Sequence, residues 1–163
     1  MSQVRIIAGP YTLLGRFEDT LAPKTCTAFR KRMPFVSKIV HVRWSGEGVW
    51  CPLGDLDFGV GLENNTCYPA AGQIILYPGG ASETEILLSY GHVNFASKAG
   101  QLSGNHMITL TEGLEHLPAL GHKTLWDGAQ DIRFELSQYP QSSMASTSDR
   151  GPVGDSAGAD RGP

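Results

Sequence analysis

Residues 39–50 read Ile39-Val40-His41-Val42-Arg43-Trp44-Ser45-Gly46-Glu47-Gly48-Val49-Trp50. Apolar and polar side chains alternate up to Trp44, and an apolar run resumes at Val49, so this stretch predicts a β-hairpin. We expect Glu47 at the hairpin tip, between two glycines and with a tryptophan on each side. A buried indole needs a partner for its N–H. The two tryptophans therefore indicate a recess beside a polar group.

Short strand-like segments recur along most of the chain and are separated by turns rich in Gly and Pro. Besides the hairpin, strands are predicted at residues 4–7, 12–17, 73–77, 85–88, 92–96, 107–110 and 132–136. Many short strands joined by such turns are typical of a barrel or a sandwich. The chain is therefore expected to be mainly β.

Two segments carry helical spacing instead. The first is residues 23–33, where apolar side chains recur every three or four positions, Pro23 suits the first turn and Pro34 stops the helix. The second is residues 112–120, with a leucine at every third position from Leu114. Thr109 or Thr111 would cap its start, Gly121 would end it, and Pro118 predicts that it is short or kinked.

The composition predicts one soluble domain without a nucleic-acid or membrane partner. The chain has 163 residues, a net charge of −3 and 18% charged residues, enough length to bury a core. The densest basic run, residues 30–32, is typical of a solvated helix end. No apolar run approaches the ~20 residues that span a bilayer. The three cysteines, Cys26, Cys51 and Cys67, lack C-x-x-C spacing and are interpreted as reduced thiols of a cytoplasmic protein.

The composition changes near residue 138. Residues 138–163 are rich in Ser, Gly, Pro and Asp and have almost no large apolar side chains, so they cannot offset the entropy of ordering themselves. We expect a folded domain at residues 1–137 and a disordered tail at residues 138–163.

Several motifs resemble the cyclophilins. Ala22-Pro23-Lys24-Thr25 followed by Phe29 is similar to the start of the first cyclophilin helix, and Glu112-Gly113-Leu114 followed by Gly121 is similar to the second. The resemblance implies a closed cyclophilin-like β-barrel of about eight strands with two short helices.

A closer resemblance is to an uncharacterised bacterial cyclophilin-like family, a domain of unknown function, over about residues 4–136. Its motifs are Arg43-Trp44-Ser45-Gly46-Glu47 with Trp50, Tyr77-Pro78-Gly79-Gly80 with Glu83-Thr84-Glu85, and Phe95-Ala96-Ser97-Lys98-Ala99-Gly100-Gln101-Leu102 with Gly104-Asn105-His106. No activity follows from that resemblance.

The residues of these motifs predict a small-molecule site for a carboxylate or a cyclic amide. Its expected catalytic residues are Glu47, Glu83, Glu85 and His106, and its expected ligand-binding residues are Arg43, Trp44, Trp50, Tyr77, Lys98 and Asn105. An arginine is a planar carboxylate receptor. Glu83 and Glu85 lie two apart, so on a strand they share one face, where like charges raise one pKa into the range of a general acid or base.

The same residues also allow structural roles. Trp44 and Trp50 suit cross-strand core partners, Glu47 a solvated tip, and Glu83 with Glu85 edge charges that block aggregation. No ligand spacing predicts a metal site, and no cofactor is expected.

Two further functions are compatible with the resemblance. One is prolyl isomerisation, for which Arg43 is the only residue that matches a catalytic position; the cyclophilin pocket motifs that should follow are missing. The other is a non-catalytic subunit or binding protein of an enzyme that degrades cyclic amides. Its partners would be that enzyme or a second copy of the chain.

Overall fold

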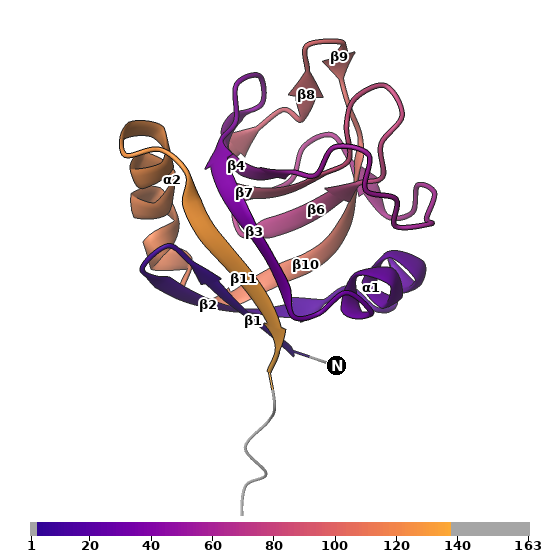
Figure 1. Ribbon diagram of the computed structural model, residues 1–163, viewed down its shortest axis with the longest axis horizontal. Helices are drawn as coiled ribbons and strands as arrows, with labels where there is room; N and C mark the ends of the chain where they lie inside the picture. Colours follow the sequence, from indigo (N-terminus) through magenta and orange to yellow (C-terminus); the bar gives the residue numbers. More distant parts are fainter. Residues whose placement is uncertain (1–2, 138–163) are drawn as a thin grey trace, which may run out of the picture.

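The structure is a computed structural model that describes residues 3–137. The tail predicted at residues 138–163 lies outside the described residues. Eight antiparallel strands form a closed ring in the order β2-β1-β11-β3-β4-β7-β6-β10, and β10 pairs back to β2 (Figure 1). The predicted closed barrel with two short helices is therefore confirmed. The strands of the ring are β1 (Gln3–Ala8), β2 (Tyr11–Phe17), β3 (Phe35–His41), β4 (Gly46–Pro52), β6 (Gln73–Tyr77), β7 (Glu85–Val93), β10 (Gly104–Glu112) and β11 (Gln130–Leu136).

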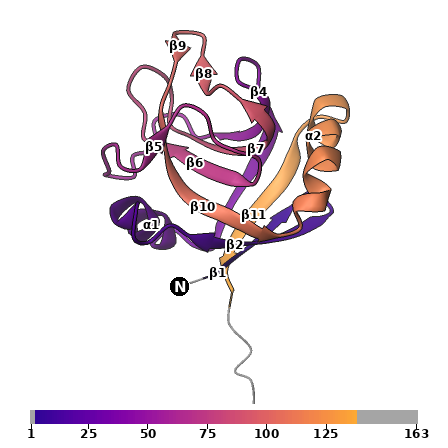
Figure 2. The ribbon, with the colours of Figure 1, turned by 180° about the vertical axis from the view of Figure 1, so that it is seen from behind.

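Three very short strands lie beside the barrel. β5 (Asn65–Thr66) pairs with β10, whereas β8 (Ala96–Ser97) and β9 (Gly100–Gln101) pair only with each other. Figure 2 shows the β8–β9 hairpin at the end of the barrel opposite β1, near the start of β4. This end of the barrel carries the candidate site.

The strands of the predicted hairpin have other boundaries than the sequence predicts. β3 ends at His41 instead of Trp44, and β4 begins at Gly46, so Arg43 and Trp44 lie in the connecting loop and Glu47 lies within a strand. The strand predicted at residues 85–88 continues to Val93 as β7 (Glu85–Val93), so it takes in the first two residues of the strand predicted at 92–96, while Ala96 belongs to β8. Pairing with β4 reaches both Ser89 and Val93, so β7 does not end at the polar residues between the two apolar runs.

Both faces of β6 are buried. Ile74 and Leu76 point into the barrel core, while Ile75 and Tyr77 belong to a second apolar cluster on the outside. Such two-sided burial explains why this strand is continuously apolar instead of alternating. The members of this outer cluster are Ile75, Tyr77, Leu87, Val93, Phe95 and Leu102, with Val42 and Trp50 packed against them.

The first helix, α1 (Pro23–Arg30), closes one end of the barrel and is shorter than predicted. Cys26 and Phe29 are fully buried. The Phe29 ring lies edge-on to Phe134 of β11, with ring centroids 5.2 Å apart. Such aromatic pairs stabilise the folded state by more than the burial of their surface alone provides. This contact therefore helps to hold α1 against the core.

The second helix was predicted at residues 112–120 and lies later in the chain. Thr109 and Thr111 are part of β10, so the predicted caps are wrong. A 3-10 turn, η1 (Leu114–His116), precedes α2 (Leu117–Trp126), and Pro118 occupies the first turn of α2, where it causes no kink.

The predicted helix end at Gly121 is also wrong. This glycine does not end the helix; it allows the helix to pack closely against a neighbouring side chain. Gly121 lies inside α2, and a Cβ added to it would meet the Tyr90 ring at 2.5 Å. Tyr90 is itself held by a 2.8 Å hydrogen bond between its hydroxyl and His41 Nε2. Glycine thus allows α2 to lie against β7. Within residues 3–137, no helix is both long and apolar enough to cross a membrane.

We predict that Gly121→Ala destabilises the protein by about 1–3 kcal/mol, because the methyl group displaces the Tyr90 ring. An exposed helix position would instead gain about 1 kcal/mol from the same change. The free energy of unfolding in urea measures the effect. Gly61→Ala is the matched control, since nothing lies within 4 Å of its added Cβ. A stabilised Gly121→Ala variant would contradict the packing role.

Candidate functional site

A cavity of about 280 Å³ opens between the loop after β3, the turn before β7 and the β8–β9 hairpin. It is lined by Val42, Arg43, Trp44, Ser45, Trp50, Ser82, Glu83, Glu85, Ala96, Ser97 and Lys98. Six of the ten residues predicted from sequence therefore lie around one cavity: Arg43, Trp44, Trp50, Glu83, Glu85 and Lys98. These residues come from three segments of the chain, which the barrel brings together.

The apolar side of the cavity is built on the outer cluster. Trp50 is half-buried on β4, is paired with Leu87 of β7, and packs against that cluster. Tyr77 lies behind the cavity and does not line it; only 6% of it is exposed. Its hydroxyl accepts a 3.0 Å hydrogen bond from the Ala81 N–H, and its ring lies 5.8 Å from Phe95. Tyr77 thus holds the turn that precedes Glu83.

The loop that carries Arg43 and Trp44 is tied to the β8 segment. Ser45 Oγ donates to the Ala96 carbonyl oxygen and accepts from the Ala96 N–H, both at 3.0 Å. The Asn94 N–H donates to the Ser45 carbonyl oxygen, also at 3.0 Å. A buried hydroxyl that is satisfied in this way fixes the two segments to each other. Arg43 and Lys98 consequently face the same hollow.

The cations of the cavity are free of acidic partners. Arg43 and Lys98 are both exposed, and within the described part of the chain neither forms an ion pair. Two unpaired cations facing one hollow create a local positive potential that favours an anion.

The two glutamates of the cavity differ in environment. Glu85 is the first residue of β7, is only 6% exposed, and has its pKa raised to about 8 by burial and then by the nearby Glu83 charge. Glu83 lies before the strand, is exposed, and accepts a 2.9 Å hydrogen bond from the Gly54 N–H. Glu85 is thus mostly protonated at neutral pH, where its carboxyl group can donate a hydrogen bond.

Glu47 lies apart from this cavity. It is within β4, and its carboxylate accepts a 2.6 Å hydrogen bond from the His92 N–H of β7. The Tyr90 hydroxyl has its pKa raised by burial and then by the Glu47 charge. The predicted position of Glu47 at a hairpin tip is therefore wrong, because the loop ends at Ser45 and Glu47 is the second residue of β4.

Asn105 and His106 lie on β10 and do not line the cavity. Asn105 is fully buried; it accepts from the Glu63 N–H and donates to Thr25 Oγ1 and the Gly61 carbonyl oxygen. These contacts tie α1 and a loop to the barrel.

His106 belongs to a separate polar chain. Thr109 Oγ1 donates its one proton to Glu18 Oε1, so His106 Nε2, 2.9 Å away, must donate to that hydroxyl. Burial is the main cause that lowers the pKa of His106. The hydrogen bond to Thr109 thus places a proton on Nε2.

The described chain offers no thiolate nucleophile among the buried cysteines and no metal cluster. Burial raises the pKa of Cys26 and Cys51 to about 12, so both stay protonated. All three cysteines are free. Among residues 3–137, no group of three or more His, Cys, Asp or Glu is arranged to hold a metal ion.

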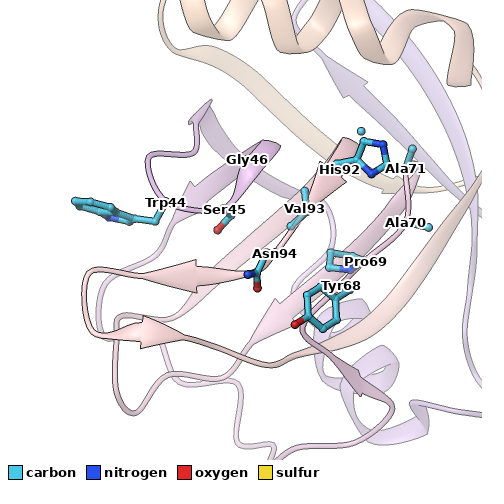
Figure 3. Close-up of a pocket in the computed structure, with 11 residues that line it drawn as sticks. Trp44, Ser45, Gly46, Tyr68, Pro69, Ala70, Ala71, His92, Val93 and Asn94 are labelled. Atoms are coloured by element: carbon cyan, nitrogen blue, oxygen red, sulfur yellow. The ribbon is translucent and has the colours of Figure 1, made fainter.

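A second hollow, a groove of about 770 Å³, adjoins the same loop (Figure 3). It shares Trp44 and Ser45 with the cavity and adds Tyr68, Pro69 and Asn94 from elsewhere. The sequence did not predict this groove, because residues 68–71 carry no periodic pattern. They come to line the groove only when the chain is folded. Their one local signal is an aromatic residue followed by proline.

The fold and the sequence define a cyclophilin-like barrel protein. Solved structures with this fold include a cyclophilin-type peptidyl-prolyl cis-trans isomerase of Cryptosporidium parvum in the presence of the dipeptide ala-pro, with 15% identity, a TM-score of 0.54, and coverage of 83% of this chain and 99% of that one. The hypothetical protein AF2241 of Archaeoglobus fulgidus is 12% identical, with a TM-score of 0.54 and coverage of 83% and 95%.

A third similar structure is McbB in complex with tryptophan. It is 15% identical, with a TM-score of 0.60; 81% of this chain is covered, but only 44% of the length of McbB. No curated protein matches the sequence. The chain belongs to the family described as protein of unknown function DUF3830, whose model matches residues 5–136.

We predict that Glu85→Gln changes how stability depends on pH. The folded-state pKa of about 8 lies above the ordinary 4.5, so Glu85 favours folding below pH 4.5 and loses that contribution as the pH rises to about 8. Relative to Glu85→Gln, the wild type should lose up to roughly 1.4 kcal/mol per pH unit across this window. Urea unfolding between pH 5 and 9 measures the difference.

Glu83→Gln serves as the companion variant to Glu85→Gln. It removes the neighbouring charge and should move the Glu85 transition to lower pH. A constant difference in stability between the wild type and Glu85→Gln from pH 5 to 9 would contradict a raised pKa.

Asn105→Ala should destabilise the protein by at least about 2 kcal/mol, because it leaves the Glu63 N–H and the Gly61 carbonyl without their partner. The midpoint of urea unfolding measures this loss. Asn65→Ala is the control, since the Asn65 side chain is exposed and donates to Ser103 Oγ. Equal stability of the two variants would show that the Asn105 contacts are weak.

Proposed function

We propose that the cavity beside Trp50 binds a small molecule that carries a carboxylate or a cyclic amide. The observation that carries this proposal is that two cations, Arg43 and Lys98, line the same cavity as Glu85, whose pKa is raised. Ligand sites are largely apolar hollows with a few convergent polar groups. At about 280 Å³, this one matches a ligand smaller than a typical drug.

Each polar group of the cavity has a distinct chemical part. Arg43 presents a planar fork of donors that suits a carboxylate, and Lys98 adds a second positive charge. The Glu85 carboxyl group donates to a carbonyl oxygen of the ligand and is the cavity's proton donor near neutral pH. Burial, and then the charge of Glu83, keeps that proton on Glu85.

The walls add apolar contact. Trp50 and Val42 rest on the outer cluster, so they present a fixed surface to a ring or a methylene chain. In this proposal Tyr77 acts as support behind the cavity, and Glu47, Asn105 and His106 make no ligand contact. The tryptophan complex of the structurally similar McbB makes an amino acid a reasonable probe.

A second candidate is prolyl isomerisation, favoured by the position of Arg43 on the cavity beside Trp44. A cation at this place can donate to the nitrogen of an X–Pro bond, while the tryptophans hold the ring. Proline peptides therefore belong in the same ligand panel.

We predict that a matching ligand raises the melting temperature of the wild type. The panel holds 5-oxoproline, hydantoin, small carboxylates, L-tryptophan and proline peptides. At 100 times its dissociation constant, a ligand adds ~2.7 kcal/mol, which corresponds to a rise of roughly 5–15 °C for a domain of this size. A thermal-shift assay measures the rise.

The variants identify the site of any shift. Arg43→Ala and Glu85→Gln should abolish or weaken it, whereas Arg5→Ala, an exposed arginine on β1, should leave it unchanged. A shift that persists in Arg43→Ala would place binding elsewhere. If no compound of the panel raises the melting temperature, this would count against the small-molecule function. It would favour a protein partner, to be sought by pull-down.

A further inference from the structure

The groove next to the cavity has an unusual exposed surface. Trp44 is 60% exposed and Tyr68 is 66% exposed, and both line it. Its remaining lining includes Pro69, Ala70 and Val93, so the groove is mostly apolar. Figure 3 shows Trp44 at one edge and Tyr68 with Pro69, from a distant segment, at another. Two exposed aromatic side chains on one groove offer surfaces on which a flat ligand group can stack.

Tyr68 is held in place although it is exposed. Gln101 Nε2 donates to the Tyr68 hydroxyl oxygen at 3.0 Å and to Asn94 Oδ1 at 2.8 Å. The Tyr68 N–H donates to Thr66 Oγ1 at 3.0 Å, and the carbonyl oxygen of the preceding Cys67 accepts from the Phe95 N–H at 2.7 Å. A ring fixed by both its backbone and its hydroxyl pays little entropy when a second ring stacks on it.

The groove and the cavity are two halves of one surface. Both are lined by Trp44 and Ser45, so they adjoin at these two residues. The cavity holds the charges Arg43, Lys98 and Glu83, whereas the only ionisable side chains lining the groove are Tyr68 and His92. A molecule that crosses Trp44 would therefore have a polar head on one side and an apolar part on the other.

From this geometry, and resting on the proposed function, we infer that the ligand is bipartite: a carboxylate–amide head in the cavity, joined to an aromatic or similarly flat apolar extension that lies across Trp44 toward Tyr68. This assigns the groove as the specificity-determining half of the site. N-acylated amino acids are the simplest compounds of this class, because their carboxylate matches the cations, their amide carbonyl matches Glu85 and their acyl group reaches outward.

A series of N-acylglycines with one constant head tests the inference. N-acetylglycine, N-benzoylglycine and N-(indol-3-ylacetyl)glycine differ only in the acyl group, and calorimetric titration gives each dissociation constant. We expect the aromatic compounds to bind the wild type about 10-fold more tightly than N-acetylglycine, the gain typical of one aromatic stack.

Four variants separate the two halves of the site. Tyr68→Ala should remove most of the aromatic gain and leave the affinity for N-acetylglycine unchanged, and Tyr68→Phe should retain part of it, since the ring remains without its Gln101 bond. Arg43→Ala should weaken all three compounds together. Trp126→Ala is the matched control, because Trp126 is 72% exposed on α2, away from the groove.

The possible outcomes test the two halves of the site separately. Equal affinity for all three compounds in the wild type, or an aromatic gain that survives Tyr68→Ala, would overturn the bipartite ligand while leaving the head site standing. Binding of none of the compounds would overturn this ligand class altogether. Binding that survives Arg43→Ala would instead contradict the proposed function.

Discussion

The outer face of β6 and β7 carries a second apolar cluster, and the rest of the site depends on covering it. Exposing this cluster to water would reduce the free energy of unfolding by roughly 1.5–3 kcal/mol for each large side chain, among them Ile75, Tyr77 and Leu87. The chain covers them with the segment that carries Phe95 and Leu102, and with Trp50 from β4. This second cluster draws the β8–β9 hairpin toward the barrel and creates a hollow where there would otherwise be a plain sheet surface.

The polar chemistry of the site follows from that packing. The Ser45–Ala96 hydrogen bonds join the loop after β3 to the covering segment, so Arg43 and Lys98 share one hollow. Glu85 begins β7 at the edge of the apolar cluster, where burial disfavours its charge. Burying an acidic group has a cost in stability, and such costs concentrate at functional sites.

The relation to the cyclophilins is one of fold. At 15% identity the Cryptosporidium isomerase shares the barrel, and function depends on side chains that the fold does not dictate. In this chain β3 ends at His41, and Arg43 lies in the loop that follows, at a cavity lined also by Trp44 and Trp50. In the proposed ligand site this loop arginine reaches a small molecule, with the groove beside it.

The sequence by itself determined the barrel class, most strands, the start of α1 and six of the residues around the cavity, because alternation, turns and motifs are local signals. It misplaced α2, since whether Gly121 ends a helix or admits Tyr90 depends on a strand far away in the chain. It also grouped Asn105 and His106 with the site, although neighbouring residues on one strand face different surroundings. Only the tertiary structure decided which loops meet, and with them the groove beside Trp44, because that meeting rests on contacts between residues distant in sequence.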